Sequence, residues 1–449
     1  MFTLGIDIGG TFTDFTLVDQ RKGEVTIDKE PTTPENPAEG ALTGTRRILE
    51  ENGVGLDDLG TVIHGTTLVS NTLIEGTGAT TGLLTTKGIR DTLKLRRGSR
   101  YDMFDWQMEY PDPLIPRHRR LELDERLNDD GEVVEPLERT EIRDQARTLI
   151  EDHNVDSIAV SLLHAYESDQ HEQLVSEVLE EEYPDLNVSL SSEVVPVIRE
   201  YERTSTTAIN AYVAPVVEDY LDFLRAELRD GGFIGEVYMM TSSGGIVDVS
   251  TAKAEPIRLV ESGPAAGVLA SRIFGQDHGN DDVFSFDMGG TTAKGSIIED
   301  ADIRMKYKTD VARKHRFKEG SGYDLISPLI DLTEIGAGGG SIASVNDVGL
   351  VEVGPESAGS DPGPVCYNQG GEKPTVTDAA LLLGYLNPET FYGGRMDLAT
   401  EQTHSVFEEK LADPLDVSIT EAAWQVFEVV NENMVTAFRE YAASRGIDT

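Results

Sequence analysis

The sequence is poor in the features that mark secreted and membrane-bound proteins. Its 449 residues include a single cysteine, Cys366, so no disulfide can form within the chain, as is typical of a reducing compartment. No apolar run approaches the ~18 residues that a membrane-spanning helix needs, and the opening residues lack the basic start of a secretory signal. We therefore expect a cytoplasmic protein that makes no membrane contact.

Positive charge is also scarce. The chain has 38 Lys and Arg residues against 81 Asp and Glu residues, a formal net charge of −43, and no lysine lies between Lys94 and Lys253. Binding to nucleic-acid phosphates needs a positive surface, so nucleic acid is excluded as a partner. The carboxylates decorate otherwise periodic helices and strands, a pattern similar to that of halophilic proteins, in which high salt screens the self-repulsion of an acidic protein.

Apolar periodicity predicts strands that alternate with helices, which is typical of an α/β protein. Three strands over 3–8, 12–18 and 24–28 are expected to form a β-meander at the start of the chain. Towards the other end, a capping box that begins at Ser418 predicts a long helix that runs to Gly446. Other strands are expected at 61–63, 82–85, 156–163, 236–241 and 283–286, and helices at 38–52 and 199–228.

Residues 98–136 interrupt this pattern. The stretch contains Pro111, Pro113 and Pro116 and few periodic apolar positions, so we expect an insertion or loop on a larger scaffold. It also contains the basic cluster Arg117–Arg120. This cluster either docks a partner or, as a simpler explanation, forms local salt bridges.

The strongest chemical signal lies where the first predicted strand ends. The strand delivers Asp7 to its end, and Gly9 and Gly10 allow the backbone to approach an anion closely. Thr11 and Thr13 add hydroxyl and amide groups around that anion. A bare carboxylate beside a polyphosphate needs a cation between them, so Asp7 is expected to face a divalent metal ion. The simpler alternative is a hairpin with a Gly-Gly turn.

A second copy of this pattern lies about 280 residues later. Asp287 ends a predicted strand, Gly289 and Gly290 follow it, and Thr291 and Thr292 come next. The same argument predicts a second phosphate-binding hairpin, with Asp287 as the other metal-facing carboxylate. Two such hairpins approaching each other would enclose a triphosphate and its metal ion.

Between the two hairpins, Glu261 opens a Glu-x-x-Pro-Ala-Ala segment that leads into a helix of small residues. Small residues permit close helix packing, which is one explanation for the segment. The functional explanation gives Glu261 the task of orienting or deprotonating a water molecule beside the metal ion.

Two further candidates are less specific. The stretch Gly336–Ser341, with Gly338 and Gly339 at its centre, predicts either an anion-binding nest or a flexible turn. Cys366 is either a nucleophile or a small buried apolar residue, and the second is favoured because no base can be assigned to it. The eight histidines lack metal-ligand spacing, so no structural zinc is expected.

Together, the two Asp-x-Gly-Gly-Thr hairpins and the segment at Glu261 resemble the phosphate and connecting motifs of the actin-like ATPase superfamily. Within it, the chain most resembles the hydantoinase A / 5-oxoprolinase family, which includes N-methylhydantoinase A and the nucleotide-binding subunits of acetone and acetophenone carboxylases. The segments that support the resemblance are His64–Thr67, Thr85–Gly88, Arg199–Arg203, Ser242–Gly245, Gly336–Ser341, Ala358–Pro364 and Pro374–Asp378.

The resemblance implies an α/β fold of the actin-like, ribonuclease H-like type, with two lobes and mixed sheets. Residues 1–197 would form the N-terminal lobe, with the first phosphate motif and the insertion, and residues 198–449 the lobe with the connecting and second phosphate motifs. In this family a glycine-rich adenosine-binding segment follows the long helix that here runs to Gly446. The second lobe is therefore expected to be incomplete. Either the gene is split or shortened, or the chain is a fragment, so the adenine side of the pocket is supplied from elsewhere, for example by a separately encoded segment, or is missing.

The resemblance also implies an activity, the ATP-dependent hydrolysis of a small cyclic amide such as a hydantoin or 5-oxoproline. ATP would phosphorylate the carbonyl oxygen, and a hydantoinase B-type subunit would act with this chain. Asp7 and Asp287 would hold Mg²⁺, and Glu261 would orient water. His64 would contact the substrate or polarise its carbonyl group, whereas a lone histidine is equally often structural. The groups expected to hold ATP are Gly9, Gly10, Thr11, Thr13, Gly289, Gly290, Thr291, Thr292, Gly338 and Gly339.

Two other functions fit the same residues. The chain is alternatively the nucleotide-binding subunit of an ATP-dependent ketone carboxylase, because the nucleotide machinery would be shared and the substrate pocket cannot be identified. It is otherwise a non-catalytic scaffold that lacks the adenosine segment. The sequence does not specify the substrate, the oligomeric state or a need for a monovalent cation.

Overall fold

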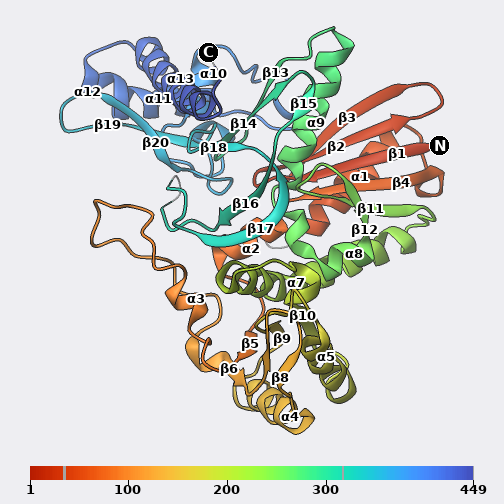
Figure 1. Ribbon diagram of the computed structural model, residues 1–449. Helices are drawn as coiled ribbons and strands as arrows, with labels where there is room; N and C mark the ends of the chain where they lie inside the picture. Colours follow the sequence, from red (N-terminus) through yellow and green to blue (C-terminus); the bar gives the residue numbers. More distant parts are fainter. Residues whose placement is uncertain (34–36, 316–317, 448–449) are drawn as a thin grey trace. The chain divides into compact units, whose positions relative to one another are not determined.

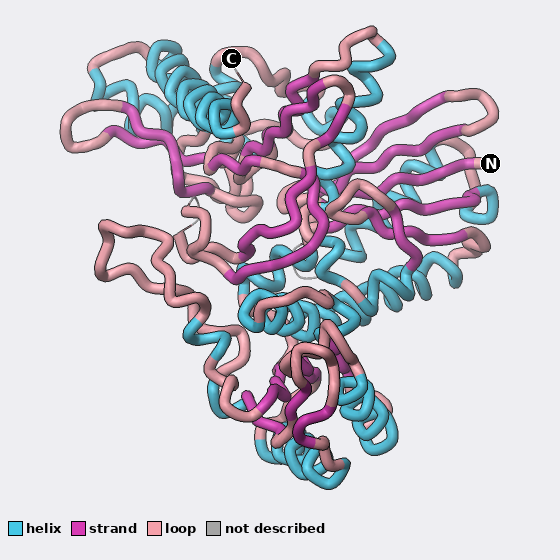
Figure 2. Tube along the Cα trace, in the orientation of Figure 1, coloured by secondary structure: helices cyan, strands magenta, loops and turns pink. Residues whose placement is uncertain are grey.

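The structure is a computed structural model that describes residues 1–33, 37–315 and 318–447 (Figure 1). The chain forms two compact units, each assembled from separated stretches of sequence. Unit 1 contains Met1–Thr3, Gly55–Ala265 and Met305–Ile330, and unit 2 contains Leu4–Val54, Ala266–Arg304 and Asp331–Thr449. Both units mix helices and strands (Figure 2), which confirms the predicted α/β class with mixed sheets. Among the described residues, every helix is too short or too polar to span a membrane.

Unit 1 is built on a parallel sheet with helices on both faces. The strand order is β10-β9-β5-β6, and adjacent residues of the central strands are buried on opposite faces. Leu84 and Ile158 pack against α4 and α5, whereas Leu83 and Ala159 pack against α7. Because strand side chains alternate, one short apolar run fills two cores. The elements are β5 (Thr81–Thr86), β6 (Arg120–Leu123), β9 (Ser157–Ser161), β10 (Asn187–Leu190), α4 (Arg139–Arg147), α5 (Gln170–Glu182) and α7 (Glu200–Asp230).

Helix α7 is the central element of unit 1, and it is buried on every side from Tyr201 to Ala214. Opposite the sheet it contacts the β16–β17 hairpin, where the Ile326 N–H donates to the Thr206 hydroxyl (3.0 Å). Strand β11 pairs in parallel with β4 and antiparallel with β12. The remaining elements are β4 (Leu59–Thr66), α2 (Leu68–Glu75), α3 (Thr92–Leu95), β7 (Arg126–Leu127), β8 (Val133–Glu135), α6 (Ser191–Val194), β11 (Glu236–Met240), β12 (Ile246–Asp248), α8 (Val249–Ala254), β16 (Met305–Val311) and β17 (Tyr323–Ile330).

The irregular structure expected over 98–136 is confined to its first half. Residues 96–116 follow α3 as a long loop, whereas β6 joins the sheet of unit 1 as a parallel partner of β5. The basic cluster pairs locally, because Arg117 Nε lies 2.9 Å from the Asp91 carboxylate and the buried Arg120 lies 3.7 Å from it. The expected local salt bridges are therefore confirmed.

Unit 2 opens with the predicted meander of β1, β2 and β3. Phe15 of β2 packs against α1, where a Cβ atom on Gly44 would lie 2.2 Å from the Phe15 ring, so only glycine fits there. The second predicted hairpin is β13 and β14, and α13 packs with α10 and α11 in an apolar core. The elements are β1 (Phe2–Ile8), β2 (Phe12–Asp19), β3 (Glu24–Pro31), α1 (Pro37–Glu51), α9 (Ser262–Asp277), β13 (Val283–Met288), β14 (Ala293–Glu299), β15 (Asp302–Ile303), β18 (Thr333–Ile335), β19 (Ser341–Val345), β20 (Val351–Ser357), α10 (Val376–Leu382), α11 (Thr400–Phe407), α12 (Asp413–Leu415) and α13 (Ile419–Ser444).

The two ends of α13 have the predicted caps. The Ser418 hydroxyl accepts a hydrogen bond from the Glu421 N–H (3.2 Å), which satisfies one of the first free amides of the helix. Gly446 follows the last turn with a φ of +75°, the left-handed conformation that glycine adopts without strain. The helix predicted from local sequence signals is confirmed.

Candidate nucleotide-binding site

The two glycine hairpins have the same turn geometry, and both belong to unit 2. In the first, the Gly9 N–H donates to the Phe12 carbonyl oxygen (3.0 Å). In the second, the Gly289 N–H donates to the Thr292 carbonyl oxygen (2.9 Å). The hydrogen bond therefore spans the same positions of the repeated motif. The similarity predicted from the sequence extends to the backbone.

Asp7 is the most perturbed group of this region. It lies near the end of β1, and its Oδ1 atom is buried without a hydrogen-bond partner in the described part of the chain. The pKa of Asp7 is raised to about 6, mainly by burial and also by the negative charges of Asp14 and Asp287, while Lys294 opposes them. A buried carboxylate that lacks a partner is costly, so its environment favours either a proton or a cation.

The second hairpin lies close to the first. Asp287 is exposed at the end of β13, and its charge acts on Asp7, as does that of Lys294 on β14. The two turns also approach directly, because a Cβ atom on Gly290 would lie 2.6 Å from the Thr11 hydroxyl. The structure thus brings together both aspartates and the glycines that follow them.

Thr13 lies behind the first turn. Its side chain is fully buried, and its hydroxyl lies 3.3 Å from the Thr32 hydroxyl. The Thr32 hydroxyl donates to the Gly9 carbonyl oxygen (2.8 Å), and its N–H donates to the Thr11 carbonyl oxygen (3.0 Å). Thr32 was missed by the sequence analysis, since no local signal connects the end of β3 with the turn.

The stretch Gly336–Ser341 packs against the second turn. The Gly339 N–H donates to the Gly289 carbonyl oxygen (3.0 Å), and the Gly340 N–H donates to the Gly290 carbonyl oxygen (2.6 Å). A Cβ atom on Gly338 would lie 2.7 Å from the Gly290 carbonyl oxygen, so the two backbones are in contact. Because these amides are already bonded to the turn, they support it and do not form an open nest.

Thr377 holds this glycine stretch from the other side. Its N–H (2.7 Å) and its hydroxyl (2.8 Å) both donate to the Gly339 carbonyl oxygen. The Ser341 hydroxyl accepts from the Gly338 N–H (2.9 Å). Thr377 is the second residue of α10, whose N-cap Thr375 and Asp378 form a capping box. A rigid helix end thus supports the glycine stretch, which supports the second turn.

His64 and Glu261 belong to unit 1, whereas the two aspartates belong to unit 2. His64 is fully buried, and its Nε2 shares a 2.6 Å hydrogen bond with the Tyr220 hydroxyl. Burial raises the pKa of Tyr220, so this phenol stays neutral. Glu261 has a φ of +56° directly before α9, an unusual conformation for a residue with a side chain. His64 thus has the buried hydrogen-bond partner that the structural alternative requires, and its contact with substrate stays a prediction.

Cys366 is fully buried, and burial raises the pKa of its thiol, with the nearby Asp378 carboxylate adding to the shift. The Asp378 carboxylate accepts the N–H groups of Cys366 (2.7 Å) and Val365 (3.2 Å), so this turn is structural. A thiol held neutral is a poor nucleophile. The prediction of a small buried apolar residue is confirmed.

The donors around Asp7 fit a divalent cation of the magnesium type. The orphaned carboxylate oxygen of Asp7 is a hard oxygen ligand. No group of three or more His, Cys, Asp or Glu side chains suited to a metal ion exists among the described residues. Mg²⁺ commonly takes one or two carboxylates and completes its shell with water and substrate phosphates, so a small protein donor set is sufficient.

Comparison with known proteins places the chain in one family. A family model described as "Hydantoinase/oxoprolinase N-terminal region" matches residues 3–183, and one described as "Hydantoinase/oxoprolinase" matches residues 203–449. An uncharacterised protein of Methanocaldococcus jannaschii is 38% identical over all of this chain and 66% of its own length. Caprolactamase subunit alpha of Pseudomonas jessenii is 36% identical over all of this chain and 64% of its own length.

Solved structures give the same result. An acetone carboxylase structure, nucleotide-free and described as ATP-dependent, matches 99% of this chain and 63% of its own with a TM-score of 0.82 and 28% identity. The ATP-dependent caprolactamase from P. jessenii matches 98% of this chain and 63% of its own with a TM-score of 0.79 and 35% identity. The chain thus spans about two thirds of the length of these relatives. The protein belongs to the hydantoinase/oxoprolinase family.

Proposed function

We propose that this chain binds ATP with Mg²⁺ between the two hairpins of unit 2, and that it serves in the ATP-dependent hydrolysis of a cyclic amide. The observation that carries the proposal is the buried, unpartnered Asp7 Oδ1 atom beside Asp287 and two Gly-Gly turns. The similarity to caprolactamase supports the substrate class, and the naming of that relative as a subunit supports action with a second, hydantoinase B-type chain.

The chemistry explains why ATP is needed. An unactivated lactam resists hydrolysis at neutral pH because its amide nitrogen is a poor leaving group. Transfer of the γ-phosphoryl group from ATP to the lactam carbonyl oxygen releases ADP and activates the carbonyl carbon. Water then adds to that carbon, the C–N bond breaks, and inorganic phosphate leaves with formation of the open amino acid. Mg²⁺ would neutralise charge that develops on the transferred phosphoryl oxygens.

The residues of the site have distinct tasks in this proposal. Asp7 and Asp287 hold Mg²⁺ and its water molecules, and the turn amides at Gly10 and Gly290 face the phosphates. Glu261 orients the attacking water. Three of the other predicted groups, Thr13, Gly338 and Gly339, act through the turns that they support, since their polar groups are already bonded within the chain.

A second candidate function is that of a ketone carboxylase subunit. It is favoured by the TM-score of 0.82 with acetone carboxylase over 99% of this chain. In that case the phosphoryl acceptor would be bicarbonate or an enolate in place of a lactam. The nucleotide site would be the same.

The test is ATP turnover by the chain together with its hydantoinase B-type subunit. If the chain serves in lactam hydrolysis, adding caprolactam, 5-oxoproline or hydantoin should increase phosphate release. The amount of phosphate released should equal the amount of ring-opened product. A ketone carboxylase would require acetone or acetophenone with bicarbonate. The Asp7→Asn variant is the control, because it should lose turnover with every substrate. Turnover that is unchanged in this variant would contradict the site.

A further inference from the structure

The long loop of unit 1 presents three large apolar side chains to solvent. The loop follows α3 and extends away from the helices of that unit (Figure 1). Met103, Phe104 and Trp106 are 81%, 97% and 87% exposed, values that exclude any packing role within the described chain. We name these three residues the aromatic tip. Three such side chains within four positions of one loop indicate a contact surface.

The aromatic tip is held in one shape by its own hydrogen bonds. The Asp102 Oδ1 atom accepts the N–H groups of Phe104 (3.0 Å) and Asp105 (3.2 Å), and the Asp105 Oδ1 atom accepts the Gln107 N–H (3.0 Å). The Arg100 guanidinium donates to the Asp105 carbonyl oxygen. A loop ordered in this way loses little conformational entropy on binding, so it is preorganised for a partner.

Two ion pairs anchor the loop to the β16–β17 hairpin. Lys318 Nζ lies 2.6 Å from the Asp102 carboxylate, and Lys314 Nζ lies 2.6 Å from the Glu109 carboxylate. The hydrogen bond from Lys318, with those from the Phe104 and Asp105 N–H groups, lowers the pKa of Asp102 to about 2, so the anchor stays charged at neutral pH. The position of the aromatic tip is therefore set by the folded unit.

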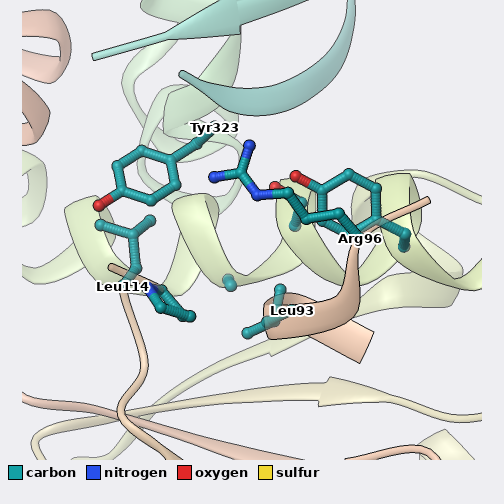
Figure 3. A pocket seen from close by; sticks show the side chains of 8 residues that line it. Leu93, Arg96, Leu114 and Tyr323 are labelled. Atoms are coloured by element: carbon teal, nitrogen blue, oxygen red, sulfur yellow. The ribbon is translucent and has the colours of Figure 1, made fainter. Parts of the chain in front are cut away.

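The base of the loop is packed, in contrast to the tip. The Arg96 guanidinium lies 4.0 Å from the Tyr110 ring centroid and donates to the Gly322 carbonyl oxygen (2.8 Å). Figure 3 shows Arg96 and Tyr323 on one side of a small pocket and Leu93 and Leu114 on the other. Apolar side chains are thus buried where the loop leaves the unit, so the exposure of the tip is a local property.

From this arrangement we infer that the aromatic tip inserts into an apolar pocket with a basic rim on a second, different polypeptide, the hydantoinase B-type subunit. The inference rests on the proposed function for the identity of that subunit. Aromatic and methionine side chains are enriched at interface centres, and Trp is among the most frequent hot-spot residues. The Asp105 carboxylate would face the basic rim, whereas that of Asp102 is already paired with Lys318.

Electrostatics disfavours the two other occupants of such a surface. A second copy of this chain has 81 acidic residues against 38 basic ones, so it would repel the acidic flanks of the tip. An anionic lipid surface would repel the Asp105 carboxylate for the same reason. A polypeptide with a basic rim is the occupant that matches both the apolar and the charged groups.

The test is the affinity of the full chain for the hydantoinase B-type subunit from the same organism, measured by isothermal titration calorimetry. The Phe104→Ser/Trp106→Ser variant should bind at least about thirtyfold more weakly than the wild type. The matched control is Ile234→Ser, because Ile234 is also in unit 1 and is 81% exposed but lies outside the loop. Both variants should keep the wild-type melting temperature, since they replace solvent-exposed side chains.

Equal affinity of the loop variant and the wild type, or no complex with the wild type, would overturn the inference. So would a loop-dependent dimer of the chain alone in analytical ultracentrifugation, or loop-dependent flotation with phosphatidylcholine–phosphatidylserine vesicles. Binding of ATP to the chain alone is measured separately. If the chain binds ATP but its loop variant still binds the second subunit normally, only the inference about the aromatic tip is refuted. The proposed function would then stand.

Discussion

The two hairpins of unit 2 share a sequence motif and a turn hydrogen bond, but they differ in what surrounds them. In the first, the carboxylate is the perturbed group, because Asp7 Oδ1 is buried and unpartnered in the described chain. In the second, Asp287 is exposed, and the turn itself is held from outside by Gly339 and Gly340. The two copies of the motif therefore have similar backbones but different roles. The first places a buried carboxylate, and the second provides a turn that is rigidly supported.

The largest expected effect comes from removing the buried charge. Asp7→Asn should abolish Mg²⁺-dependent ATP binding, a loss of at least about a thousandfold or ~4 kcal/mol, because the amide cannot neutralise the metal ion. Asp287→Asn should weaken binding less, since its exposed carboxylate keeps its hydration. Isothermal titration calorimetry with and without Mg²⁺ measures both. Equal losses in the two variants would erase the proposed difference between the hairpins.

Ionisation of Asp7 should have opposite effects on folding stability and on ligand binding. The charged carboxylate is needed to hold Mg²⁺, but it lowers the free energy of unfolding of the chain without ligand. Burial, together with the charges of Asp14 and Asp287, raises the pKa of Asp7 from an ordinary 3.8 to about 6. Ionisation therefore costs stability as pH rises from about 4 through 6. Without nucleotide or Mg²⁺, Asp7→Asn should be more stable than the wild type by up to about 3 kcal/mol at pH 8. The two should converge below about pH 4. Urea unfolding at several pH values checks this. A difference between Asp7→Asn and the wild type that does not depend on pH would contradict it.

The support of the second hairpin should be sensitive to one added methyl group. Gly338→Ala places a Cβ atom 2.7 Å from the Gly290 carbonyl oxygen, so the second turn must shift. We expect about tenfold weaker ATP binding, because misplaced donors lose charge-assisted hydrogen bonds. Gly267→Ala is the matched control, since a Cβ atom there meets open space within 4 Å. Normal ATP affinity in Gly338→Ala would show that the support is not needed.

The smallest effect is expected at Thr377, because it contacts the glycine stretch that supports the second turn and not the turn itself. Thr377→Val removes the hydroxyl donor to the Gly339 carbonyl oxygen and keeps the side-chain shape. ATP affinity should fall about threefold to tenfold, in line with the loss of one buried hydrogen bond. Thr377→Ser should restore it, because the donor returns. Failure of the serine variant to restore affinity would point to packing in place of hydrogen bonding.

Features that depend on local sequence were predictable. The meander of β1–β3, both glycine hairpins and the capped helix α13 follow from periodicity, turn residues and caps, and they lie where they were expected. The family and the α/β class also followed from those motifs. Each of these signals spans only a few neighbouring residues.

Features that depend on distant residues were not predictable from one sequence. Thr32 supports the first turn from the end of β3, and Thr377 supports the glycine stretch from 38 residues away. His64 pairs with Tyr220 at a separation of 156 residues, and no local pattern marks that partnership. Polar groups that satisfy one another across the fold leave no spacing signal in the chain.

The most direct test of a metal ion shared by the two hairpins is a crystal structure of the chain with Mn²⁺ and a non-hydrolysable ATP analogue. Anomalous scattering locates Mn²⁺ without ambiguity. The expected result is one Mn²⁺ ion bound by Asp7 Oδ1, directly or through one water molecule, with Asp287 in its hydration shell and the phosphates between the two turns. A metal-bound nucleotide located elsewhere, with Asp7 Oδ1 still unpartnered, would contradict it.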